Sequence, residues 1–351
     1  QVDRFCEDLR LFGVAPDHVF PFPAIERDTV LRSASDYAAL GDRMMALRAL
    51  AEEDSAVVVG TVEAALQRVG PPDEVLGARI VVSVGETVAL DMLQYQLASI
   101  GYFSVTTVTQ PGHFAQRGGI LDVFPIGASL PVRIEMFGDA VESIRRFDPS
   151  TQRSTGSIPR IEVLPARAFV LTRERANAAV PRVRELLAAR CEQLMAAGRR
   201  AEAEDLEDRI GTDLARLRER EYFDAIEDYI PYIVPEDVCA FDYLKAGKAA
   251  QAGRPPIVVL DDAEMLETHW QRVLTERAEA RERRKARGDM LEGAEWQGVS
   301  PAGLSRVAEA GGVLELSPIE RNRCRYSDAA PVVLHSAAME SFHVRVEFLA
   351  E

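Results

Sequence analysis

Cysteine, histidine and lysine are scarce in this chain of 351 residues. Its 4 cysteines and 5 histidines are scattered along the sequence, and no two cysteines form a CxxC pair. These residues predict neither a disulfide framework nor a zinc site, because both need clustered ligands. No apolar run reaches the ~18 residues of a membrane helix, and the opening residues QVDRFCEDLR lack the apolar core of a secretory signal. We expect a reduced, cytoplasmic protein whose opening residues form the middle of a helix in a longer chain.

A shortage of positive charge limits the partners of the chain. Its 41 Lys and Arg residues are outnumbered by 56 Asp and Glu residues, which gives a formal net charge of −15. Binding to duplex DNA depends largely on cationic side chains that displace counterions from phosphates. The composition therefore argues against autonomous DNA binding, and a protein partner is the better prediction. The length suggests two or three domains of roughly 100–200 residues each.

The sequence also lacks a phosphate-binding loop of the form GxxxxGK[ST]. The apolar stretch PPIVVL does run into the acidic pair Asp261 and Asp262. This arrangement is typical of a Walker B site, where one carboxylate holds Mg²⁺ and the next orients water. Without a loop for the phosphates, an acidic turn at the end of a strand is the better interpretation. No Ser/His/Asp or Cys/His arrangement stands out either, so we expect no catalytic residue, metal or cofactor in this chain.

The pattern of the sequence changes near residues 84 and 175. Residues 1–83 and 176–351 alternate between short apolar runs and helical patterns, as in an α/β domain with parallel strands. Residues 84–175 contain one helical stretch followed by short strands separated by Gly and Pro, which predicts a small inserted α+β domain. Residues 177–223 carry apolar residues near helical spacing, interrupted at Gly198, and predict a two-helix hairpin. The expected fold class is therefore α/β combined with α+β.

The strand predicted at residues 132–137 has two different faces. Successive side chains of a strand point to opposite faces of the sheet, so the apolar residues of VRIEMF would face the core, and Arg133, Glu135 and Phe137 would lie on the opposite side. Arg and aromatic residues are enriched among interface hot spots, so this opposite side is a candidate docking surface. The alternative is a solvated strand whose Phe137 is covered by a neighbouring loop.

Two glycine-containing turns adjoin these residues. The Gly-Asp pair at 138–139 indicates a hairpin. A strict two-residue turn would place Glu135 opposite Glu142, an unfavourable pair of like charges, so we expect a longer loop. The Gly-Gly pair at 118–119 permits a bulge or a close backbone approach directly after Arg117, which would present this guanidinium from a bent strand edge.

Three segments carry a resemblance to a known family. GHFAQRGGILDVFP at 112–125, LPVRIEMFGDAVESIRRFDPSTQRS at 130–154 and IEVLPARAF at 161–169 resemble, in order and spacing, the UvrA-binding domain shared by UvrB and the transcription-repair coupling factor Mfd. EDLEDRIGTDLARLREREYFDAIEDYIPY at 204–232 resembles the helical hairpin of the same proteins. LDDAEML at 260–266 lies where their second helicase motif would fall.

The resemblance implies a fold and favours one of the two relatives. The fold would be a degenerate RecA- or helicase-like α/β domain, split by the inserted UvrB-interaction domain. VFPFPAIERD runs directly into a helix without the tyrosine-rich hairpin by which UvrB clamps DNA, and FDPSTQRS looks more like the coupling factor. We therefore favour the amino-terminal, UvrB-like region of Mfd. The alternatives are a UvrB-like excinuclease subunit, which is an ATPase and DNA clamp, and a purely structural arm of a translocase.

The resemblance also implies a function and a binding site. The function is recruitment of UvrA during transcription-coupled nucleotide excision repair. The family binds UvrA through two Arg and a Phe, which match Arg117, Arg133 and Phe137, and Glu135 matches the acid between them. A C-terminal domain would cover this surface until RNA polymerase is engaged. RNA polymerase, double-stranded DNA, and ATP with Mg²⁺ would be bound by other parts of the parent protein, an ATP-dependent DNA translocase.

Overall fold

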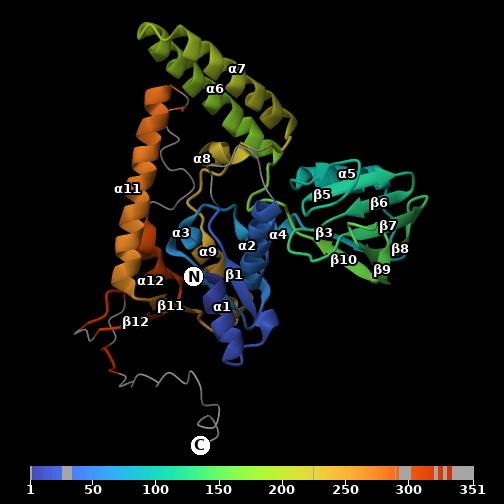
Figure 1. The fold of residues 1–351 in the computed structure, drawn as a ribbon, viewed down its shortest axis with the longest axis horizontal. Coiled ribbons are helices and arrows are strands. Elements are labelled where there is room, and N and C mark those ends of the chain that lie inside the picture. Colours follow the sequence, from blue (N-terminus) through green and yellow to red (C-terminus); the bar gives the residue numbers. More distant parts are fainter. Residues whose placement is uncertain are drawn as a thin grey trace, which may run out of the picture.

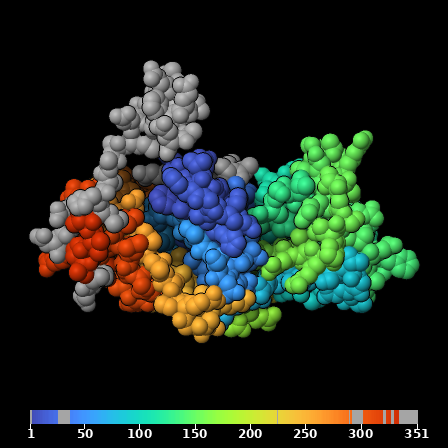
Figure 2. Space-filling view, turned by 90° about the horizontal axis from the view of Figure 1, so that it is seen from below, coloured from blue at the N-terminus to red at the C-terminus, as the bar shows by residue number. Residues whose placement is uncertain are grey.

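The computed structural model describes residues 2–25, 34–223, 225–288, 290–291, 302–319, 323–326 and 330–333. The predicted mixed α/β fold is confirmed. A sheet domain lies at one end of the molecule, a long helical hairpin projects from the centre, and a long helix runs along the other end (Figure 1). The last described elements of the chain, coloured red, lie at the opposite end from the sheet domain (Figure 2). No helix in the described ranges is long and apolar enough to cross a membrane.

The first part of the chain builds the centre of the molecule. Its elements are α1 (Val2–Leu11), η1 (Pro16–His18), β1 (Val19–Phe22), α2 (Ala34–Glu52), β2 (Val57–Gly60), α3 (Val62–Leu66) and α4 (Pro72–Gly77). The strands β1 and β2 pair in parallel, with Val19 opposite Val57. Such short apolar runs suit parallel strands covered by helices, and α1 and α2 pack on this pair.

The inserted domain contains a six-stranded sheet, a separate pair of strands and one helix. Its elements are β3 (Ile80–Ser83), α5 (Leu90–Ser99), β4 (Phe103–Ser104), β5 (His113–Arg117), β6 (Ile120–Val123), β7 (Val132–Phe137), β8 (Ala140–Phe147), β9 (Ser154–Ser157) and β10 (Arg160–Val163). The sheet has the order β4-β5-β6-β7-β8-β9, and all its pairs except β4-β5 are antiparallel. The strands β3 and β10 pair with each other, so the chain enters and leaves the inserted domain side by side.

The helical hairpin follows the inserted domain. It consists of α6 (Arg173–Ala196) and α7 (Arg200–Glu219), with Gly198 at φ 75° in the turn between them. Thr172 caps α6 by accepting a hydrogen bond from the backbone N–H of Arg175. The apolar residues of the two helices form one buried cluster: Val183, Leu187, Leu194, Leu206, Ile210, Leu214 and Leu217. This shared stripe holds the helices together along the projecting arm (Figure 1).

The remaining described elements lie first in the centre of the molecule and then at the end opposite the inserted domain (Figure 1). They are η2 (Ile226–Tyr229), α8 (Ile230–Ile233), α9 (Ala240–Ala246), α10 (Lys248–Gln251), β11 (Ile257–Asp261), α11 (Ala263–Arg287), η4 (Gly303–Ser305), α12 (Arg306–Ala310) and β12 (Gly312–Leu316). The strands β11 and β12 form a second parallel pair, with Val259 opposite Leu314. The charged stretch at 276–287 predicts a solvent-exposed helix, and it forms the last part of the longer α11, because no Gly or Pro interrupts α11. Residues 334–351, at the end of the predicted segment 176–351, lie outside the described residues. So do residues 26–33, which include the last three residues of VFPFPAIERD.

The inserted domain is packed closely on α2. A Cβ atom on Gly41 of α2 would lie 2.5 Å from the backbone nitrogen of Gly127, so the two backbones touch where no side chain fits. One turn earlier, the ring of Tyr37 packs edge-on against His113, with 5.9 Å between the ring centroids. The inserted domain is therefore held in a definite position by its contacts with α2.

Candidate functional site

The two sides of the six-stranded sheet differ in chemistry. One side is buried against α5 and contributes Phe114, Leu121, Val123, Val132, Ile134, Val141 and Ile144 to the main core. Strand alternation and the pairing register place a second set of side chains on the opposite side, which we call the outer face: Ala115, Arg117, Ile120, Asp122, Arg133, Glu135, Phe137, Ser143, Arg145 and Phe147. The outer face contains all four residues that the sequence selects as a docking surface.

Phe137 lies at the exposed end of β7. Its side chain is 81% exposed, so the alternative in which a loop covers the ring is wrong. The ring stands beside the Gly138–Asp139 turn, with Gly138 at φ 60°, and Phe137 pairs directly with Ala140. Burial of a phenylalanine side chain stabilises a protein by about 1.5–3 kcal/mol, and here that contribution is unused within the monomer.

The turn after Phe137 differs from the sequence prediction. The expected longer loop is wrong: the hairpin closes with two residues, since Phe137 pairs with Ala140. A β-bulge then shifts the register, so that Glu135 pairs with Ser143 and Glu142 has no direct partner on β7. The extra residue in β8 thus separates the two carboxylates that a regular hairpin would have placed opposite each other.

Arg117 reaches solvent from the neighbouring hairpin. The chain reverses at Gly118, whose φ is 59°, and a Cβ atom on Gly119 would lie 2.9 Å from the carbonyl oxygen of Met136. This confirms the close backbone approach that the glycine pair predicts, although it occurs in a tight turn and not at a bent edge. The exposed Arg117 donates hydrogen bonds through Nη2 to the carbonyl oxygen of Thr106 at 2.7 Å and to Oγ1 of Thr107 at 2.9 Å.

Arg133 is largely engaged inside the domain. Its Nε and Nη2 atoms donate hydrogen bonds to the two carboxylate oxygens of Asp122 at 2.7 and 2.8 Å. Only 18% of the Arg133 side chain and 3% of the Asp122 side chain are exposed. The guanidinium carbon lies 4.7 Å from the centre of the Phe147 ring, and Asp122 raises the pKa of Arg133. The sequence interpretation of Arg133 as an open contact residue therefore needs correction, because two strands share this guanidinium as an internal clamp.

A small apolar cluster explains why this clamp is buried. Val108, Ala115, Phe124 and Phe147 form a separate hydrophobic cluster on the outer face. Arg133 stacks on Phe147 at the border of that cluster and also donates a 3.4 Å hydrogen bond to the carbonyl oxygen of Gln152. One end of the outer face is therefore covered, while the end that carries Arg117 and Phe137 stays open.

Glu135 is also held by neighbours within the sheet. Its Oε2 atom accepts a 2.6 Å hydrogen bond from the Ser143 hydroxyl and lies 3.4 Å from Nη2 of Arg145. Arg145, which the sequence interpretation does not select, pairs with Arg133 across the strands and has 43% of its side chain exposed. Its position follows from the register, which the bulge changes, so strand alternation in β7 alone does not identify it.

The acidic pair at the end of β11 has a structural role. Asp262 has a φ of 57° and caps α11 by accepting a 3.3 Å hydrogen bond from the backbone N–H of Met265. Asp261 is exposed and pairs with Leu316. This geometry supports an acidic turn at a strand end over a Walker B-like site. Within the described ranges, no group of three or more His, Cys, Asp or Glu residues could hold a metal ion.

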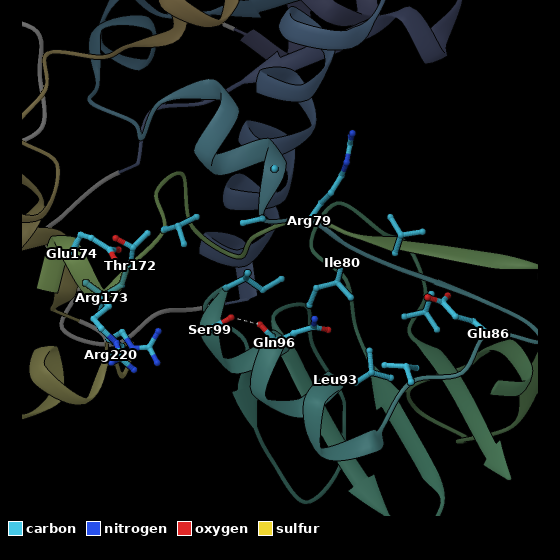
Figure 3. Close-up of a pocket in the computed structure, with 18 residues that line it drawn as sticks. Arg79, Ile80, Glu86, Leu93, Gln96, Ser99, Thr172, Arg173, Glu174 and Arg220 are labelled. Carbon is cyan, nitrogen blue, oxygen red and sulfur yellow. Dashed lines mark hydrogen bonds between the residues drawn. The ribbon is translucent and has the colours of Figure 1, made fainter. Parts of the chain in front are cut away.

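A cleft of about 560 Å³ lies between the inserted domain and the base of the hairpin. Figure 3 shows Arg173 and Arg220 at its hairpin end and Glu86 at the far end. Arg220 donates a hydrogen bond to the Tyr95 hydroxyl of α5, so it ties the hairpin to the inserted domain. The lining comes from the end of α4, β3, α5, the start of α6 and Arg220 after α7, together with adjoining loops, and it contains no residue of the outer face. We interpret the cleft as the joint between two parts of the molecule.

Comparison with known proteins identifies the part of the chain that carries the outer face. Residues 80–169 match the UvrB interaction domain. The match begins with the first residue of β3 and includes the whole six-stranded sheet. The chain therefore contains a segment of the type that carries this interaction in UvrB-related proteins.

Individual relatives are of two kinds. UvrABC system protein B of Prochlorococcus marinus (strain MIT 9303) is 34% identical over 219 residues, which is 62% of this chain and 30% of that protein. UvrABC system protein B of Legionella pneumophila (strain Corby) is 32% identical over 208 residues, 58% of this chain and 31% of that protein. The transcription-repair-coupling factor of Bacillus subtilis (strain 168) is 32% identical over 202 residues, 57% of this chain and 17% of that protein.

These similarities leave the choice between the two kinds of relative open. The identities are nearly equal, and the chain matches less than a third of the length of each relative. The comparisons therefore support a region of the UvrB or coupling-factor type. They do not favour the coupling factor specifically.

Proposed function

We propose that this chain recruits UvrA in nucleotide excision repair, as the UvrA-binding module of a transcription-repair coupling factor. The observation that carries the proposal is the exposed Phe137 ring on the same sheet face as the exposed Arg117, in a segment that matches the UvrB interaction domain. Aromatic and arginine side chains are enriched among interface hot spots. The partner surface would offer an apolar socket for the ring and carboxylates for the arginine.

The choice of the coupling factor over UvrB rests on the sequence. The chain has no GxxxxGK[ST] loop, and Asp262 of its acidic pair caps α11. We propose that this module hydrolyses no ATP, and that ATP and Mg²⁺ are bound by motor domains elsewhere in the parent translocase. RNA polymerase and double-stranded DNA would likewise bind other parts of that protein. A C-terminal domain of the parent protein would cover the outer face before RNA polymerase is engaged.

A UvrB-like subunit is the second candidate function. It is favoured by the 34% identity with UvrABC system protein B of Prochlorococcus marinus. This candidate predicts that the parent protein binds ATP and DNA through the region that contains the present chain. Equilibrium binding of a DNA duplex would distinguish the two, since the recruiting module is expected not to bind it.

The proposal is tested by measuring the affinity of UvrA for the chain. We expect Phe137→Ala to weaken binding by about thirtyfold or more, equivalent to ~2 kcal/mol, and Arg117→Glu to weaken it further through charge repulsion. Phe12→Ala is the matched control, because Phe12 is 85% exposed but follows α1, away from the sheet. Equal affinity of all variants would refute the site, and no binding by the unmodified chain would refute the function.

A further inference from the structure

The charged residues of the outer face are not equally available to a partner. Arg133 is engaged with Asp122, and Glu135 is engaged with Ser143 and Arg145. Two of the four residues selected from the sequence therefore have their charges satisfied within the sheet. The positive charge of an intermolecular contact must come from other side chains on the same face.

We infer that Arg145 is a third contact residue of this surface and that Glu135 orients it. This inference rests on the proposed function, since it concerns the same docking surface. Arg145 has 43% of its side chain exposed, against 18% for Arg133. Its link to Glu135 is a single ion pair of 3.4 Å between partly exposed groups. Only Nη2 of Arg145 lies near Glu135, so the guanidinium can keep this contact while it offers its other N–H groups to a partner carboxylate.

The placement of Arg145 defines the kind of partner that fits. One row of paired residues crosses four neighbouring strands: Arg117 on β5, Ile120 on β6, Glu135 on β7 and Ser143 on β8. Arg145 lies two residues further along β8. With a spacing of about 4.8 Å between strands, the two exposed arginines stand on strands roughly 14 Å apart. Ile120 lies between them, and Phe137 stands at the tip of the same face. The surface thus fits a protein that presents two separated carboxylates around an apolar socket.

The chain offers a matched control for Arg145. The next residue, Arg146, is exposed on the same strand but pairs with Val132, so it projects from the opposite side of the sheet. Arg145→Ala and Arg146→Ala remove the same charge from adjacent positions. We expect Arg145→Ala to weaken UvrA binding about tenfold and to reduce the dependence of affinity on salt, while Arg146→Ala changes neither.

The role of Glu135 is tested by a double-mutant cycle. If Glu135 acts by orienting Arg145, Glu135→Gln weakens binding less than Arg145→Ala, and the double variant binds as weakly as Arg145→Ala alone. Additive losses would show that Glu135 contacts the partner itself and would overturn the orienting role.

The outcomes separate this inference from the proposed function. If UvrA binds the unmodified chain and Phe137→Ala weakens it, but Arg145→Ala and Arg146→Ala both bind normally, the assignment of Arg145 is refuted and the docking surface stands. If Phe137→Ala also binds normally, the surface itself is refuted. Thermal unfolding of Arg145→Ala should match that of the unmodified chain, which makes a weakened affinity a binding effect.

Discussion

Removal of Arg133 should destabilise the inserted domain far more than removal of any other outer-face arginine. The guanidinium forms a two-pronged contact with Asp122, at 2.7 and 2.8 Å, and only 3% of the Asp122 side chain is exposed. Arg133→Ala leaves that carboxylate buried without its ionic partner. Breaking a buried pair in this way costs about 3–5 kcal/mol, a large part of the ~5–15 kcal/mol that stabilises a typical domain. Loss of packing on Phe147 adds to this cost.

The decisive comparison removes both charges together. Asp122→Leu with Arg133→Met replaces the pair with apolar side chains of similar size, and such replacements are often neutral or stabilising. We expect urea unfolding to show a large loss for Arg133→Ala, a small change for the double variant, and a change below about 0.5 kcal/mol for the more exposed Arg145→Ala. Equal losses for Arg133→Ala and the double variant, or a loss below about 1 kcal/mol for Arg133→Ala, would refute the clamp.

The same pair of variants separates folding from docking. If Arg133 serves docking only by holding the face in shape, the double variant should bind UvrA nearly as well as the unmodified chain. If the guanidinium contacts UvrA directly, the double variant should be stable but should bind weakly. Affinity measured at a temperature well below the unfolding transition of both proteins gives the answer.

Three further features lead to measurable expectations. Gly41→Ala should destabilise the chain by about 1–3 kcal/mol, since the new Cβ atom would lie 2.5 Å from the backbone nitrogen of Gly127. Gly211→Ala on α7 should stabilise the chain by up to ~1 kcal/mol, because its Cβ atom would have nothing within 4 Å. Urea unfolding of the two variants measures both changes. Burial lowers the pKa of His113 below its ordinary 6.5. The contribution of His113 to the free energy of unfolding is therefore complete above pH 6.5 and is lost as the pH falls through the lowered pKa. His113→Gln should reduce this pH dependence in unfolding midpoints measured from pH 7.5 to 5. Asp262→Ala should lower the free energy of unfolding by about 1 kcal/mol, because it removes the cap of α11. Asp262→Asn should keep most of that stability, because its amide oxygen can accept the same hydrogen bond. Thermal unfolding measures both variants.

Local patterns were sufficient to predict most of the elements. Period-two alternation in VRIEMF identifies both faces of β7, because one face is buried against α5 and the other is open. Helical spacing and the break at Gly198 locate the hairpin arm, since the facing stripes of α6 and α7 are continuous. The long α11 was underestimated because its first half lacks the dense charge that marks its second half.

The candidate site was less predictable, because it depends on contacts between strands. Alternation correctly assigned Phe137 to the open side, but it contains no information on which residue of β6 lies beside Arg133. Asp122 stands between Leu121 and Val123 in an apolar strand, and only the pairing of β6 with β7 reveals it as the partner of Arg133. The bulge in β8 is a second non-local feature, and it decides which side chain approaches Glu135.

Hydrogen bonds and a tight turn fix side chains at the open end of the outer face before a partner binds. Immobilising side chains on association costs about 0.5–1.5 kcal/mol for each flexible residue. Here Arg117 is already anchored to the 106–107 loop and Glu135 is held by Ser143, while Phe137 stands on a tight two-residue turn. The surface is therefore largely arranged before a partner arrives, and its open aromatic ring supplies the apolar area that remains to be buried. Affinity should then depend on the few exposed residues Arg117, Phe137 and Arg145, while Asp122, Arg133 and Ser143 act through the shape of the face.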